Sequence, residues 1–253
     1  MLALDFPPIN EILRWRDLIP AIGFNKISLI VVMAVIISIT VFALAVRQDP
    51  MKPPRGVRNL AEVIVEFIEQ QIIMPTIGRS GMGWTPMLLT MFVFIFLCNI
   101  TGIIPVLQMP ATARLAIPLF LSLVVWLVFI GAGIKAQGLG YFSHLVWPPG
   151  VPVALKPLVG LIELVSTLLV RPFSLTIRLF ANLLAGHILL VTFAVLAQEL
   201  VKNDNLLFKG MSILPWLMLV FLTAFEVLVA FLQAYIFVIL TAVYIDSSVH
   251  PEH

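Results

Sequence analysis

The sequence predicts an all-α integral membrane protein, and three observations carry this prediction. Hydrophobic residues make up 61% of the 253 residues and charged residues only 11%, whereas a soluble domain carries about 25% charged residues. The mean hydropathy is +1.10. Several uncharged apolar runs reach the length of about 18 residues at which a run becomes a candidate membrane-spanning helix. No long polar block interrupts these runs, so we expect one membrane domain with about five membrane-crossing helices.

The first membrane span is expected at residues 27–46, preceded by a mixed polar and apolar N-terminal segment at residues 1–26. At 1.5 Å per residue this span is about 30 Å long, which equals the thickness of the hydrocarbon core. The densest basic cluster of the chain follows at once: Arg47, Lys52, Arg55 and Arg58. Short loops rich in lysine and arginine lie on the cytoplasmic side of a membrane. We therefore expect an external N-terminus and, after five crossings, a cytoplasmic C-terminus.

An amphipathic helix is expected at residues 59–74. Glu62, Glu66 and Glu69 recur at i, i+4 and i+7, which places them on one helical face. Aliphatic residues dominate the remaining positions, and Pro75 is expected to end the helix. Because the segment is too short and too acidic to span a membrane, it is expected to lie in the plane of the cytoplasmic interface. The row of glutamates is interpreted as a solvated face in preference to a metal or proton site.

Two further spans are expected at residues 85–104 and 117–134. Trp84 precedes the first of them and is typical of an anchor at the membrane interface. Asn99 lies inside that span, where an amide either lines a polar path or, more commonly, forms a hydrogen bond between helices. Lys135 directly follows the second span and is expected on the cytoplasmic side.

The last two apolar segments, at residues 155–200 and 213–245, are too long to cross a membrane upright. As straight helices they would measure about 69 Å and about 50 Å, against a hydrocarbon thickness of about 30 Å and a tilt that rarely exceeds about 40°. Pro172 removes a backbone hydrogen bond from the first segment and is expected to kink it. We therefore expect a long, bent and steeply tilted hairpin that lies against a second body.

Ionisable residues inside apolar spans occur only in these last two segments, and such residues mark ion pathways. They are Glu163, Arg171, Arg178, His187 and Glu226, accompanied by the polar Asn182 and Gln233. On a helix, Arg171, Arg178 and Asn182 share one face, whereas His187 lies about 180° around from Arg178. His187 and Glu226 both lie toward the external ends of their helices. They are expected to form a pair that can pass protons, because histidine changes charge near neutral pH.

Arg178 is the sharpest of these residues because no acidic residue lies within four positions of it. An arginine at the bilayer centre costs about 2.5–3.5 kcal/mol on insertion scales, which indicates a partner on another helix or another subunit. Its side chain stays charged, so it is expected to act as a fixed positive charge and not as a proton carrier. An internal pair with Glu226 is the structural alternative. The other structural alternatives are an interfacial position for Arg171 and for Glu163, and packing hydrogen bonds from Asn182 and Gln233.

The segment around Arg178 resembles the signature of subunit a of F-type ATP synthases of the bacterial type. The match lies in residues 174–182, which read SLTIRLFAN, and in the tripeptide AGH that ends at His187. The last helix is similar as well, with Glu226 followed by LQAYIFVILT at residues 232–241. The run NITGIIP at residues 99–105 also looks like the family's pattern, and the resemblance extends over the chain from the first span onward.

The resemblance implies a proton-translocating stator subunit in the membrane sector of an ATP synthase. Arg178 would be the essential stator arginine that drives release of the proton from the carboxylate of a rotating c-ring, with Asn182 and Gln233 beside it. The implied partners are the c-ring, subunit b of the peripheral stalk, the other subunits and membrane lipid, in the inner membrane of a bacterial cell.

The resemblance also implies two half-channels that lead protons to and from the ring. His187 and Glu226 would line the external half-channel, in an order in which histidine comes first where some members of the family have the acid first. Glu163 and Ser174 would lie on the cytoplasmic half-channel. Glu163 is one residue farther from the arginine motif than is usual in the family, so its assignment is the least direct.

Two other classes of protein are compatible with the residues alone. A proton-coupled secondary transporter or channel would use an internal Arg178–Glu226 pair, and inverted repeats or paired broken helices would favour it, but neither is clear here. A non-conducting assembly protein would tolerate loss of Arg178. Since no glycine-rich phosphate loop is present, we expect no nucleotide binding. We also expect no other cofactor, no metal, no nucleic acid and no catalysis by this chain alone. One His/Glu pair, in place of a cluster of oxygen ligands, favours H⁺ over Na⁺ as the ion.

Overall fold

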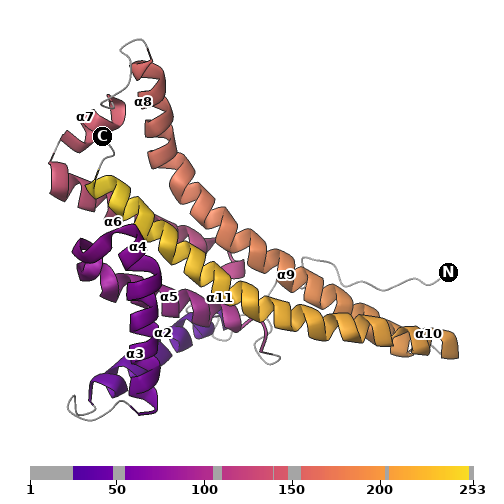
Figure 1. Ribbon diagram of the computed structural model, residues 1–253. Helices are drawn as coiled ribbons and strands as arrows, with labels where there is room; N and C mark the ends of the chain where they lie inside the picture. The colour runs from indigo at the N-terminus through magenta and orange to yellow at the C-terminus, as the bar shows by residue number, and fades with distance from the viewer. Residues whose placement is uncertain are drawn as a thin grey trace.

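The computed structural model describes residues 25–47, 55–104, 110–138, 140–147, 155–202 and 205–250. Within these ranges the regular structure is helical, without strands. Five of the described helical stretches are long and apolar enough to cross a membrane: Lys26–Val46, Gly78–Ile100, Ala116–Gln137, Lys156–Lys202 and Leu207–Val249. The chain is therefore an all-α integral membrane protein, as predicted (Figure 1). Most of the predicted N-terminal segment 1–26 and part of the basic cluster, including Lys52, lie outside the described residues.

Helix α2 (Lys26–Val46) forms the first span and begins at a side-chain cap. The side-chain oxygen of Asn25 accepts hydrogen bonds from the backbone N–H groups of Ile27 and Ser28, both at 3.1 Å. Asparagine is favoured at this position because it satisfies N–H groups that lack a partner within the helix. The cap therefore explains why the helix starts within one residue of the predicted boundary.

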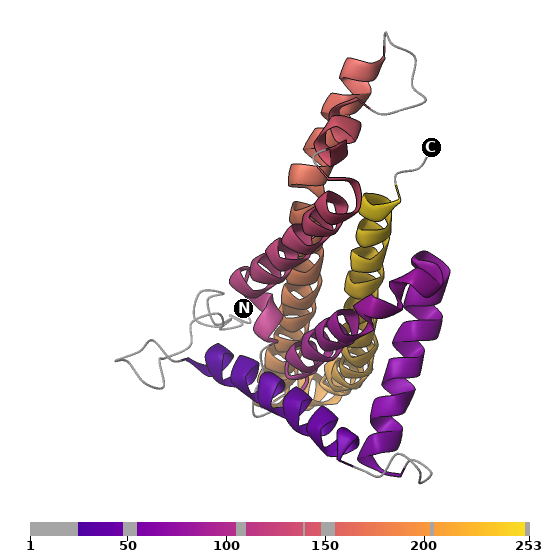
Figure 2. The same cartoon turned by 90° about the vertical axis from the view of Figure 1, so that its left-hand side faces the viewer.

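The predicted amphipathic helix is one continuous helical stretch. It consists of α3 (Val57–Ile68), the π-helical turn η2 (Glu69–Ile73) and α4 (Met74–Thr76). The stretch passes through Pro75 because the π turn widens the backbone there: the Met74 N–H donates to the carbonyl of Glu69, five residues back. Pro75 has no N–H to donate. Its ring would clash with the carbonyl group one turn earlier in a regular helix, and a widened turn reduces this clash. Figure 2 shows α3 meeting α2 at an angle, as the two arms of a V.

The glutamates of this stretch accept hydrogen bonds from side chains within it or in the next helix. Arg58 donates to Glu62 at 2.7 Å, and Gln70 donates to Glu66 at 2.9 Å. Both glutamates are exposed. These contacts support the interpretation of the acidic row as a solvated face.

The two middle spans differ from their predicted bounds at their C-terminal ends. They are preceded or joined by short turns, in the order η3 (Gly78–Trp84), α5 (Thr85–Ile100), η4 (Ala111–Ala113) and α6 (Ala116–Gln137). Helix α5 ends at Ile100, and residues 101–104 form a turn. Helix α6 continues past the predicted residue 134 until Gly138, whose φ of 64° suits a glycine that ends a helix.

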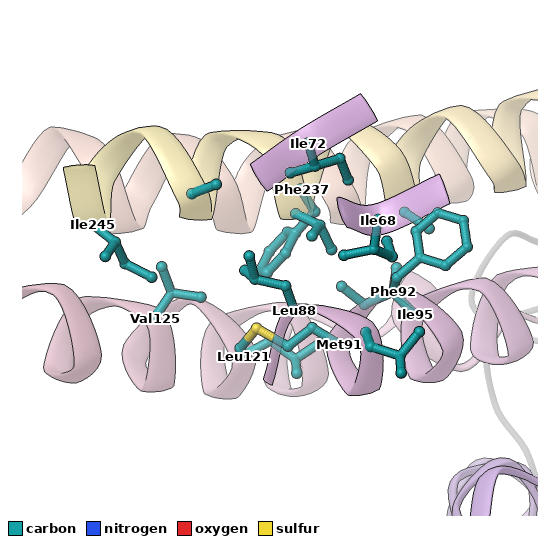
Figure 3. Close-up of a cluster of buried hydrophobic side chains, with 14 of the residues drawn as sticks. Ile68, Ile72, Leu88, Met91, Phe92, Ile95, Leu121, Val125, Phe237 and Ile245 are labelled. Carbon is teal, nitrogen blue, oxygen red and sulfur yellow. The ribbon is translucent and has the colours of Figure 1, made fainter. Parts of the chain in front are cut away.

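A buried apolar core joins these elements to the last helix (Figure 3). Its members in the figure come from α3 and η2, α5, α6 and α11: Ile68, Ile72, Leu88, Met91, Phe92, Ile95, Leu121, Val125, Phe237 and Ile245. Leu175, Leu179 and Leu183 add one face of α9 to the same core. Their spacing of four residues places them on a single stripe of the helix, so the opposite stripe of α9 is turned away from the core.

The long hairpin is present. One arm consists of α8 (Lys156–Val165), the π-helical turn η5 (Ser166–Val170) and α9 (Arg171–Lys202), after the short α7 (Gly140–Val146). The other arm is α11 (Ile213–Val249), reached through α10 (Leu206–Met211). Figures 1 and 2 show α9 and α11 running side by side, with α8 bent away from them. Helix α11 continues four residues beyond the predicted residue 245.

The bend occurs where the sequence predicts it, and its geometry is that of a π turn. The Arg171 N–H donates to the carbonyl of Ser166, five residues back, and Pro172 follows directly. Pro75 likewise follows a π turn by two residues. At both sites a proline leaves the regular backbone ladder incomplete, and the helix continues through a widened turn, which is a common cause of a kink.

Candidate functional site

Arg178 lies on the outward stripe of α9. The side chain is exposed, and so are Asn182 and Leu189, which lie within about 40° of it around the helix. The apolar Phe173 and Ile177 nearby are exposed as well. Within the described part of the chain the guanidinium has no hydrogen-bond or ion-pair partner. The site is therefore a permanent positive charge on an exposed and mostly apolar face of the helix, next to the polar Asn182.

Gln233 reaches α9 at the level of Arg178. The residue is 3% exposed, and its Nε2 donates to the backbone carbonyl of Arg178 at 3.5 Å, the long limit for such a bond. The amide therefore contacts the backbone of Arg178 and leaves the guanidinium on the outer side. Sequence reasoning placed these two residues together, and the structure adds which atoms meet.

His187 and Glu226 lie on the buried side of the hairpin, with exposed fractions of 5% and 9%. Glu226 packs against Gly186: a Cβ built on that glycine would stand 2.6 Å from Glu226 Oε1. The carboxylate thus lies next to the residue that precedes His187. The described contacts include no direct hydrogen bond between the two side chains, so their pairing stays a prediction.

The structural alternative of an internal Arg178–Glu226 pair is not formed. Glu226 lies at Gly186, eight residues along α9 from Arg178, a rise of about 12 Å. Around α9, Gly186 lies about 80° from Arg178, and Arg178 is exposed whereas Glu226 is buried. The arginine and the acid are therefore separate components of the site.

Asn99 forms a hydrogen bond between helices, which is the more common of its two predicted uses. Its Nδ2 donates to the carbonyl of Ala230 in α11 at 3.4 Å, one turn from Glu226. Its Oδ1 accepts from the hydroxyl of Thr112 at 2.6 Å. Sequence reasoning missed Thr112. The sequence carried no signal for this contact: Thr112 lies in the short turn Ala111–Ala113, whose complete burial only the structure shows.

A second buried pair, also missed from the sequence, joins α6 to α9. The hydroxyl oxygens of Ser122 and Thr176 lie 2.6 Å apart. Thr176 also donates to the carbonyl of Pro172 at 2.8 Å, within the turn that follows the bend. Hydroxyl pairs of this kind fix two membrane helices against each other.

The remaining predicted site residues do not converge on Arg178. Glu163 in α8 and Ser174 in α9 are half-buried, and no described contact joins either of them to the guanidinium. Arg171 is not merely turned toward the interface, because it packs on aromatic rings of α6 and α11. Among the described residues no three His, Cys, Asp or Glu side chains gather as metal ligands would.

Five apolar helical stretches, which carry an outward arginine and a buried acid and histidine, are the features of a multi-pass membrane protein with ionisable groups inside its spans. Comparison with known proteins identifies the family. The sequence profile of the family "ATP synthase A chain" matches residues 27–246. The chain belongs to this family, which supports a role as a proton-translocating subunit in the membrane sector of an ATP synthase complex.

Individual relatives agree over nearly the whole chain. The "ATP synthase subunit a" of Frankia alni is 43% identical over 232 residues, which cover 90% of this chain and 79% of the relative. That of Maricaulis maris is 36% identical over 251 residues, or 97% of this chain and 96% of the relative. That of Bartonella tribocorum is 37% identical over 232 residues, or 92% and 90%. The family match at residues 27–246 extends from the first described helix to the last.

Proposed function

We propose that Arg178 is the stator arginine of a rotary proton motor. The observation that carries the proposal is a permanent charge on an apolar, outward stripe of α9 without an internal partner. A charge held there at a cost of about 2.5–3.5 kcal/mol needs a counter-charge from outside the chain. The carboxylate in the membrane-embedded part of a c-ring subunit has the required charge and depth, and it would exchange with its neighbour at each step of rotation.

His187 and Glu226 line the path by which protons enter from outside. Both are buried in the α9–α11 hairpin, and His187 lies about 180° around α9 from Arg178. A proton that passes them neutralises a ring carboxylate, and the neutral carboxyl group then travels around the ring in contact with lipid. Burial of the entry pair behind the outward stripe keeps the path separate from the arginine.

Protons leave toward the cytoplasm past Glu163 and Ser174. Arg178 makes the returning carboxyl group ionise, because the fixed positive charge stabilises the carboxylate. The same charge repels a proton that hops directly from one half-channel to the other. Each charge that crosses is driven by about 2.3 kcal/mol per 100 mV of membrane potential.

The remaining assignments follow from the same proposal. The chain works with the c-ring and with subunit b of a peripheral stalk, in the inner membrane of a bacterial cell. Its N-terminus is external, its C-terminus is cytoplasmic, α3 lies in the plane of the cytoplasmic interface, and the α9–α11 hairpin is steeply tilted. The ion is H⁺.

The test replaces Arg178 by alanine in the assembled complex. ATP-driven acidification is measured in inverted vesicles, with the subunit content checked after purification. The expected result is complete loss of pumping with normal assembly. Ile177→Ala, which removes the exposed apolar side chain that precedes Arg178 in the sequence, is the control and is expected to pump within twofold of the native complex. Normal pumping by Arg178→Ala would overturn the proposal and favour a non-conducting role.

A further inference from the structure

Arg171 lies at the point where three helices meet. Its guanidinium carbon is 5.1 Å from the ring centroid of Tyr244 in α11 and 5.8 Å from that of Phe129 in α6. Its Nη1 donates to the hydroxyl of Ser247 at 3.2 Å. The two rings also contact each other, with centroids 5.8 Å apart. Arginine stacks on aromatic faces and donates in its own plane, so one side chain connects α9 to both neighbours.

The direction of the side chain follows from the antiparallel packing of α9 and α11. Arg178 lies opposite Gln233, and Gly186 lies opposite Glu226, so residue numbers run in opposite directions along the two helices. Side chains on a helix lean toward its N-terminus. Arg171 therefore leans toward the C-terminal end of α11, where Tyr244 and Ser247 are found.

The backbone near Arg171 is held less firmly than that of a regular helix. The π turn η5 ends at Val170 and Pro172 contributes no N–H. The hydroxyl of Thr167 inside this turn is buried without a hydrogen-bond partner in the described structure. Beyond the turn, most of the apolar side chains of α8 are exposed. The side-chain contacts of Arg171 therefore contribute to the attachment of this end of α9, together with those of Leu175 and Thr176 farther along the helix.

We propose that Arg171, Phe129, Tyr244 and Ser247 form a clamp that sets the position of α9 along α6 and α11. Arg178 follows Arg171 by seven residues, a rise of about 10.5 Å on the same face. A slide or pivot of α9 at the clamp would move the guanidinium of Arg178 away from the surface that it presents. Arg171 is thus a positioning residue for Arg178, an inference that rests on the function proposed above.

The test measures helix position separately from pumping. In the assembled complex, Ser122→Cys and Thr176→Cys replace the hydroxyl pair that joins α6 to α9, in a Cys98→Ala background that must pump like the native complex. Hydroxyl oxygens 2.6 Å apart are compatible with the Cβ separation of about 3.5–4.5 Å that a disulfide needs. The rate of oxidative cross-linking then reports the position of α9 against α6. Pumping is measured in the same variants without the added cysteines.

Arg171→Leu and Tyr244→Leu are each expected to slow cross-linking at least threefold and to reduce pumping at least fivefold. The double variant is expected to lie within 1.5-fold of either single variant, because both changes open the same clamp. Tyr244→Phe keeps the ring and is expected to retain native rates within 1.5-fold. Tyr235→Leu, which removes a half-buried tyrosine of α11 that packs on Phe67, is the matched control and is expected to leave cross-linking unchanged.

A native cross-linking rate in Arg171→Leu would overturn the clamp. Native rates of both cross-linking and pumping in Tyr244→Leu would overturn it as well. Arg171 would then act through its charge alone. Arg178→Ala separates this inference from the proposed function. It is expected to abolish pumping while the cross-linking rate stays native, since its side chain is exposed. Pumping by Arg178→Ala would refute the stator role, whereas the cross-linking results for Arg171 and Tyr244 would still decide the clamp.

Discussion

Glu226 occupies the space in which a side chain at Gly186 would stand. A Cβ on that glycine would lie 2.6 Å from Glu226 Oε1 and 3.4 Å from Cδ. The glycine therefore lets the carboxylate of α11 approach the backbone of α9 beside His187. This close approach joins the two helices that carry the proposed entry path.

Gly186→Ala is expected to displace the carboxylate without unfolding the hairpin. The atom in conflict is the end of a flexible side chain, so Glu226 can turn away at small steric cost. We expect normal assembly and a thermal midpoint within about 2 °C of the native complex, which corresponds to no more than about 1 kcal/mol. Pumping is expected to fall at least fivefold. The control is Gly131→Ala, where an added Cβ meets no atom within 4 Å. A native pumping rate in Gly186→Ala would show that the position of this carboxylate is not critical.

Gln233→Leu tests the contact between α11 and the backbone of Arg178. Leucine keeps much of the volume and removes the amide that donates at 3.5 Å. Because the bond is long, its loss is expected to cost no more than about 1 kcal/mol of stability. Pumping is expected to fall by twofold to tenfold, since the position of Arg178 is no longer fixed from this side. Leu232→Ala, an exposed neighbour, serves as the control, and a larger effect from it than from Gln233→Leu would contradict the assignment.

Asn99 and Thr112 are expected to act as one unit in stability. Asn99→Ala removes the acceptor of the Thr112 hydroxyl, and Thr112→Val removes a donor to Asn99. Each single change leaves a buried polar group without its partner, at a cost of about 1–3 kcal/mol. The loss of stability in the double variant is expected to be smaller than the sum of the two single losses by about 0.6–1.5 kcal/mol. Coupling of this size is usual for polar contacts between membrane helices. Denaturant or thermal unfolding of the purified subunit complex gives the three values, and strict additivity would exclude the contact.

Gly160→Ala is expected to separate α8 from α7. A Cβ at this position would overlap the backbone carbonyl of Val146, and a backbone atom cannot turn aside as a side chain can. Since Glu163 lies three residues farther along α8, the displacement moves the proposed exit path. We expect lower pumping with an intact entry side, and cysteines placed in α7 and α8 would become more accessible to a membrane-permeant thiol reagent. Gly210→Ala, which meets no atom within 4 Å, is expected to behave as the native protein.

Much of the fold was accessible from the sequence because membrane solvation constrains it strongly. Uncharged runs of sufficient length must become helices, since every backbone polar group in lipid needs an internal partner. The opposite faces of Arg178 and His187 followed from helical periodicity alone, and both the outward arginine and the buried histidine are present. The bend at Pro172 was predicted for the same kind of reason, because a missing N–H is a property of the residue.

Contacts between helices were much less accessible. The sequence named Asn99 and Gln233 but not the carbonyl groups that they meet, and it did not indicate Thr112 or Ser122 at all. Arg171 illustrates the limit most clearly. A long cation near a helix end is typical of an interfacial position, and only the packing of α6 and α11 brings Phe129, Tyr244 and Ser247 around it.

The sequence by itself therefore determined that this chain is a helical membrane protein, which residues carry charge inside its apolar segments, and which of them share a helical face. Those properties depend on local periodicity and on the cost of polar groups in lipid. The tertiary structure decided that Arg178 has no partner within the described chain, that Glu226 lies against Gly186, and that Arg171 joins three helices. These relationships depend on the relative position of helices far apart in sequence, which side-chain packing determines and periodicity does not.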